Sequence, residues 1–213
     1  MNAVSEPHPA GHGDRKPHDV SGAPPIPLSL KHLPVLAGLA VPYITARRLD
    51  GAWRFGAIDA DRQEQCLHHS LCQVCGRPLE SGPMVFLVRP VADALILPDW
   101  VVAEVAEPAL HPHCLAYTVA ACPMLSGAMT HYRTSPVPMG EGAVHAPDSA
   151  ARYGHPAEPW YEVWVRHYQL AVLTSAGHRS VRAKLNQRPL RIRALENHPA
   201  HPGLRRTVPD PTC

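Results

Sequence analysis

Residues 71–78, LCQVCGRP, decide the fold when they are read with the second half of the motif, LHPHCLAYTVAACPML at residues 110–125. In the first stretch Cys72 and Cys75 are separated by two residues, so one tight turn can aim both sulfurs at one metal ion. Gly76 follows directly, as expected where the backbone curls back toward the sulfurs in an unusual φ range. This pattern is typical of a metal-binding knuckle.

The second stretch supplies another pair of donors at the same separation, followed by a helical pattern. A thiolate at the start of that helix is favoured by the helix dipole. Four nitrogen and sulfur donors complete a tetrahedral shell, so the sequence predicts one structural Zn²⁺ ion. Its predicted ligands are Cys72, Cys75, His111 and Cys114.

Two substitutions in this ligand set stay open. His113 can replace His111, although its position next to Cys114 makes the reach harder. Cys122 is either a further ligand or, as we favour, a small apolar core residue on the helix. The remaining cysteines, Cys66 and Cys213, are interpreted as free thiols.

The segments LCQVCGRPL, MVFLVRPV and AEPALHPHCLAYTVAACPML resemble a family of small zinc-finger-like proteins found in phages and in actinobacterial and proteobacterial genomes. Its members share a CxVCG turn, a short apolar strand, an EPPxHxxCAxYAxxACPFL helix and a later Trp-containing strand. The resemblance covers about residues 71–125 and implies that the four ligands belong together. Ala109 replaces the second Pro of the pattern, which leaves the ligands untouched. No activity comes with the resemblance.

Short-range signals predict the elements before the knuckle. Residues 43–49 and 52–58 flank Asp50-Gly51, a turn that matches the twist of a β-hairpin. Asp59 then stands where a helix N-cap belongs, which predicts a short helix to about residue 69.

Between the ligand pairs, the apolar run at residues 84–91 predicts a buried strand, and residues 92–108 contain a second candidate strand around Val101. From His113 the apolar residues recur at helical spacing until Pro123 ends the run.

The C-terminal part is interpreted as an antiparallel meander of three runs, at residues 160–173, 180–185 and 190–195. Alternation along the last two runs predicts one apolar and one basic face. The basic residues, candidates for nucleic-acid contacts, are Arg182, Lys184, Arg191 and Arg193.

We therefore expect an α+β protein with a treble-clef-like zinc-binding core, an N-terminal β-hairpin and a C-terminal antiparallel meander. The expected divisions are a disordered tail at 1–30, a zinc-binding core at 31–133, a Pro- and Gly-rich linker or loop at 134–159, a basic antiparallel β segment at 160–197 and a disordered tail at 198–213.

Composition sets limits on the class of protein. Residues 1–177 hold 12 Lys and Arg against 16 Asp and Glu, while residues 178–206 hold 8 against 1, so the positive charge gathers near one end. The longest apolar stretch is too short to span a bilayer, and the N-terminal residues do not read as a signal peptide. Cysteines without a signal peptide favour a reducing, cytoplasmic location.

The function expected first is a zinc-stabilised interaction module, an adaptor or regulatory protein that binds another protein. The alternative is a nucleic-acid-binding protein that uses the basic C-terminal sheet. The second alternative, a metal-dependent enzyme such as a nuclease, lacks an assigned catalytic residue, and four good ligands favour a closed metal site. Its only candidates are Cys66, His68, His69 and His113.

Overall fold

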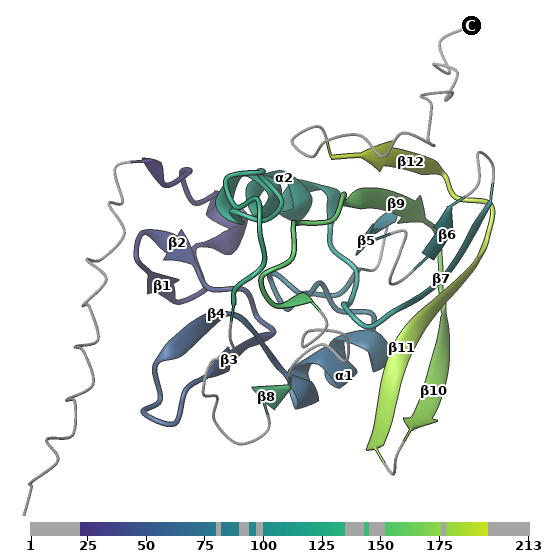
Figure 1. Cartoon of the computed structure of the whole chain (residues 1–213), viewed down its shortest axis with the longest axis horizontal. Helices are drawn as coiled ribbons and strands as arrows, with labels where there is room; N and C mark the ends of the chain where they lie inside the picture. Colours follow the sequence, from purple (N-terminus) through teal and green to yellow (C-terminus); the bar gives the residue numbers. More distant parts are fainter. Residues whose placement is uncertain are drawn as a thin grey trace, which may run out of the picture.

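A computed structural model describes residues 22–79, 82–89, 94–96, 100–134, 143–144, 152–175 and 178–195 (Figure 1). Over these residues the chain is α+β, with two α-helices and mostly antiparallel strands. None of the helices in these ranges has the length and apolar character needed to cross a membrane. The expectations for residues 1–21, for 196–213 and for most of the 134–159 linker lie outside the described residues.

The predicted N-terminal hairpin is confirmed. Strands β3 (Thr45–Arg47) and β4 (Trp53–Asp59) pair antiparallel around a turn in which Gly51 has φ +79°. The two-residue strand β8 (Ala143–Val144) adds to the far side of β4.

The helix α1 (Ala60–His68) begins directly after the hairpin. The Asp59 side chain accepts a hydrogen bond from the Arg62 amide at 3.0 Å, which is the expected N-cap. Cys66 and Leu67 face the core, so α1 delivers the chain to the knuckle from a fixed direction.

One three-stranded sheet carries the apolar run between the ligand pairs. Strand β5 (Met84–Val88) pairs antiparallel with β9 (Tyr161–Val165), and β9 pairs with β12 (Arg191–Ala194). Phe86 is fully buried and meets the Tyr168 ring edge-on at 5.4 Å.

A four-stranded sheet has the order β10-β11-β7-β6. Its strands are β10 (Gln169–Ser175), β11 (His178–Gln187), β7 (Val101–Val105) and β6 (Ala94–Ile96). The strand expected around Val101 is therefore confirmed as β7.

The expected C-terminal meander is confirmed only in the antiparallel pairing of β10 with β11. The run at 160–173 splits into β9 and β10, and β12 pairs with β9 instead of β11. Strand β9 pairs with β5, and β11 pairs with β7, so strands that lie between the two ligand pairs complete the C-terminal sheets. A local sequence pattern cannot reveal which distant strand will be the partner. Residues from 31–133 and 160–197 thus share both larger sheets.

Ordered structure also begins earlier than the expected tail boundary at residue 30. A 3₁₀ turn (Leu28–Leu30) places Leu30 in the core with no exposed surface, and its apolar side chain accounts for this anchoring. The short hairpin of β1 (Val35–Leu36) and β2 (Leu39–Ala40) follows.

Candidate metal centre

The knuckle around Cys72 and Cys75 is a tight turn closed by its own backbone. The Gly76 amide donates to the Cys72 carbonyl at 2.8 Å, and the Cys72 amide donates to the Arg77 carbonyl at 2.8 Å. Gly76 has φ +70°, in the left-handed region that glycine adopts without strain. The turn holds both cysteine side chains in the buried interior.

Two neighbouring segments fix the position of this turn. The amide of Tyr43 donates to the Val74 carbonyl at 2.9 Å, so the start of the N-terminal hairpin lies along one side. The amide of Gln73 donates to the Ala109 carbonyl at 3.1 Å, which ties the knuckle to the segment that carries the second ligand pair. The backbone hydrogen bonds therefore align both halves of the site.

The second pair is positioned by strand β5 and by helix α2 (Pro112–Ala121). Val85 of β5 exchanges two backbone hydrogen bonds with Leu110, at 3.0 and 2.8 Å, directly before His111. His111 is the N-cap residue of α2, and Pro112 occupies its first turn, where a missing N–H costs nothing. Cys114 follows in the first turn of the helix and is fully buried.

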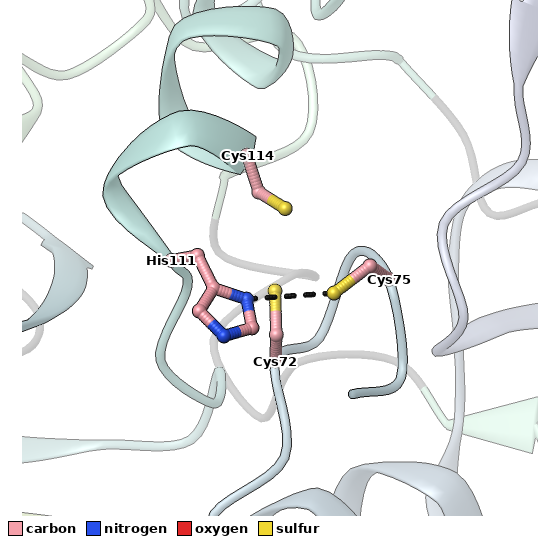
Figure 2. Close-up of side chains that lie close together, drawn as sticks. All are labelled: Cys72, Cys75, His111 and Cys114. Atoms are coloured by element: carbon pink, nitrogen blue, oxygen red, sulfur yellow. Dashed lines mark hydrogen bonds between the residues drawn. The ribbon is translucent and has the colours of Figure 1, made fainter. Parts of the chain in front are cut away.

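All four predicted ligands converge on one point. Their donor atoms lie within 4.8 Å of one another, and Figure 2 shows the side chains directed together from the knuckle and from the start of α2. The Cys75 sulfur and His111 Nδ1 are 3.4 Å apart. Tetrahedral zinc with one sulfur and one nitrogen ligand separates those donors by about 3.6 Å. The cluster can therefore hold a metal ion.

His111 is oriented by a second contact. While its Nδ1 faces the sulfurs, its Nε2 lies 3.0 Å from the Pro78 carbonyl, which accepts a hydrogen bond when Nε2 carries the proton. That tautomer leaves Nδ1 unprotonated and free to coordinate. Because Pro78 lies just after the knuckle, the first ligand pair helps to orient the second.

The three sulfurs also change one another's protonation. A hydrogen bond from Cys114, and a second from Cys72, lower the pKa of Cys75. The hydrogen bonds with Cys72 and Cys75, together with burial, raise the pKa of Cys114. Three sulfurs this close share protons because adjacent buried thiolates repel one another. A divalent cation among them removes that penalty and allows all three to coordinate.

The cluster contains the original four residues and neither of the two alternatives. His113 is exposed and stacks on the His111 ring, with centroids 4.8 Å apart, outside the cluster. Cys122 is the C-cap of α2 and packs against the core.

The other residues named as catalytic candidates do not form a second site. Burial raises the pKa of the Cys66 thiol to about 12, so it stays protonated near neutral pH. His68 pairs with Glu64 at 3.3 Å on the exposed side of α1, and His69 ends that helix. Across the described ranges, the knuckle cluster is the only group of three or more His, Cys, Asp or Glu residues arranged to hold a metal.

The four basic residues proposed for nucleic acid are divided between two sheets. Arg182 and Lys184 lie on β11, whereas Arg191 and Arg193 lie on β12. Arg182 donates to the Glu104 carbonyl at 3.4 Å, and Arg191 lies over the Trp164 ring at 5.7 Å.

Arg193 is bound to a buried carboxylate that sequence reasoning missed. Glu162 on β9 has no exposed surface, and it accepts hydrogen bonds from Arg193 Nε at 2.8 Å and from Trp164 Nε1 at 2.7 Å. The only signal in the sequence is Glu162 within an otherwise apolar strand, opposite Arg193 in the β9–β12 register. This pair ties β12 to β9 and compensates a buried charge.

No protein-family model, curated protein or solved structure matches this chain.

Proposed function

We propose that this protein is a zinc-stabilised interaction module, in which the metal centre supports the fold and does not carry out a reaction. The observation behind the proposal is the closed cluster: four protein donors lie within 4.8 Å of one another, three of them on buried cysteines. Four protein ligands fill a tetrahedral shell and leave no position for a substrate or an activated water.

The donor set favours zinc over other metals. Three thiolates and one imidazole suit Zn²⁺, whereas Mg²⁺ and Ca²⁺ require oxygen ligands. A knuckle facing a helix N-terminus supports the treble-clef interpretation. Because thiolate ligands need reduced cysteines, this centre requires a reducing compartment such as the cytoplasm.

Metal content and chelator-dependent melting test the structural role. We expect one zinc per chain, and Cys75→Ser should lose the metal and unfold the core, since structural zinc contributes about 10 kcal/mol or more in small zinc domains. Cys122→Ser, outside the cluster, is the matched control and should retain the metal. If zinc can be removed without a large fall in melting temperature, the structural proposal is wrong.

The outer edge strand β10 is the feature that supports the proposal of a protein partner. It ends the described four-stranded sheet and carries seven residues without charge or proline, QLAVLTS. Leu170 and Val172 are 41% and 55% exposed on it. Edge strands are usually protected by lysine, proline or a bulge, and an unprotected one can accept an added strand. We propose that an extended apolar segment of another protein adds to β10.

A strand-edge variant tests this partner surface. Val172→Lys should abolish capture of the partner, whereas Val102→Lys, at an exposed position on the inner strand β7, should retain it. The purified partner should then slow amide hydrogen exchange in β10. Equal capture by Val172→Lys, or unchanged exchange in β10, would refute strand addition.

A further inference from the structure

A second group of charged residues gathers on the β3–β4 hairpin, away from the metal centre. Figure 1 shows this hairpin projecting from the body of the molecule, at the lower left. Arg47 and Trp53 are register partners, and the Arg47 guanidinium lies 4.1 Å from the centre of the Trp53 ring. Neighbouring residues in extended chain point to opposite faces, so Arg48 and Arg54 share the other face of the hairpin.

A third arginine reaches this face from a distant segment. Arg133, which follows α2, lies over β4 and donates to the Gly56 carbonyl at 3.5 Å. A Cβ at position 56 would lie 2.6 Å from Arg133 Nη2, so glycine leaves the space that the guanidinium occupies. Three guanidinium groups from three separate segments therefore gather beside one another.

The described residues supply little to neutralise these charges. Arg48 has one exposed carboxylate partner, Asp50, at 3.5 Å, and water screens such a pair. In the described part of the chain, neither Arg54 nor Arg133 is paired with a carboxylate. The Nε of Arg54 is buried without a hydrogen-bond partner.

The electrostatic cost of this arrangement is visible at Arg54. Burial, followed by the charges of Arg133 and Arg48, lowers the pKa of its guanidinium. Like charges held together are stabilised by an anion that contacts all of them, and guanidinium groups match the planar oxygen pairs of phosphate.

We propose that Arg48, Arg54 and Arg133 form a binding site for the phosphate groups of a nucleic-acid strand. A strand is favoured over a small phosphate ion because Arg48 and Arg54 lie on a projecting hairpin, and further arginines lie at its other face. There Arg47 and Arg62 both lie over Trp53, at 4.1 and 5.4 Å from the ring centre. Contacts of this kind follow a backbone and are independent of base sequence.

This site differs from the C-terminal basic residues in both position and pairing. Arg193 is already bound to Glu162, and the remaining basic residues there are divided between two sheets. The inference does not depend on the metal proposal, because no residue of the hairpin site is a metal ligand.

Fluorescence anisotropy with a labelled single-stranded oligothymidylate tests the proposal on the full, zinc-loaded chain. Three phosphate contacts predict that log K falls with log salt with a slope of about −2. The Arg48→Gln/Arg133→Gln variant should reduce the slope to about −0.7 and weaken binding roughly tenfold or more at low salt. The control Lys184→Gln/Arg191→Gln removes two exposed charges from the C-terminal strands and should retain the wild-type slope.

Three results would overturn the proposal. No binding by the wild type at low salt, or equal losses in both double variants, would show that the hairpin has no special role. If inorganic pyrophosphate binds as tightly as the oligonucleotide, the ligand is a small phosphate and not a strand. Should Arg133→Gln fail to fold, the exposed Arg48→Gln change alone must still lower the slope by about 0.7.

Discussion

Replacing Gly76 with alanine should damage the knuckle by two separate effects. Gly76 has φ +70°, and a non-glycine residue in this left-handed region costs roughly 1–2 kcal/mol. An added Cβ would also lie 2.8 and 2.9 Å from two carbons of the Tyr43 ring, closer than carbon atoms approach without displacement. Overpacking of this kind costs roughly 1–3 kcal/mol.

The sum is about 2–5 kcal/mol, which corresponds to a fall of about 5–15 °C in the melting temperature of a chain this size. Gly51→Ala is the matched control, because Gly51 has φ +79° but a Cβ added there would have no atom within 4 Å. It should cost only the backbone strain, about 1–2 kcal/mol.

Thermal melting of the metal-loaded proteins, with chelator competition for metal affinity, measures both variants. In a Tyr43→Ala background the ring is gone, so Gly76→Ala should cost no more than Gly51→Ala does. If Gly76→Ala and Gly51→Ala lower the melting temperature equally in the wild-type background, the contact between the knuckle and Tyr43 does not limit stability, and the steric argument fails.

Three further changes test the packing around the site. Tyr117→Phe removes the hydroxyl that accepts from the buried Ala40 amide at 2.8 Å, and denaturant unfolding should show a loss of about 1–3 kcal/mol. Arg193→Gln leaves the fully buried Glu162 carboxylate without its charge partner, and melting should reveal a loss of about 3 kcal/mol, a value near zero counting against the pair. Burial raises the pKa of Cys66 to about 12 in the folded protein, against a reference value of 9.0. Between these pH values the unfolded chain loses this proton and the folded protein keeps it, so the free energy of unfolding should fall as the pH rises from 9 to 12. Cys66→Ala should reduce that alkaline loss in unfolding curves recorded across this range.

Local signals in the sequence were sufficient for the elements near the knuckle. Asp50-Gly51 predicted the hairpin because only certain residues fit its turn, and Asp59 predicted the start of α1 because its carboxylate caps the helix. The paired spacing of cysteine and histidine predicted which donors meet, since each pair is brought together by its own local turn.

The pairing of strands could not be predicted in the same way. Alternation along residues 180–195 identifies strand and face, but the same pattern fits several neighbours. β11 therefore pairs with β7, and β12 with β9, through contacts between distant parts of the chain. Glu162 was missed because its burial depends on Arg193 arriving from another strand.

The position of the four-residue cluster in the chain also bears on the order in which the strands can pair. Closing the cluster between Cys75 and His111 encloses β5, β6 and β7 in one loop, yet their partners β9 and β11 come later in the sequence. Under the zinc proposal, a nascent chain can close this loop around the metal at modest entropic cost while the edges of β5 and β7 are still unpaired. Under the zinc proposal, a shortage of the metal during synthesis would prolong the exposure of these strand edges to aggregation and lower the yield of folded protein.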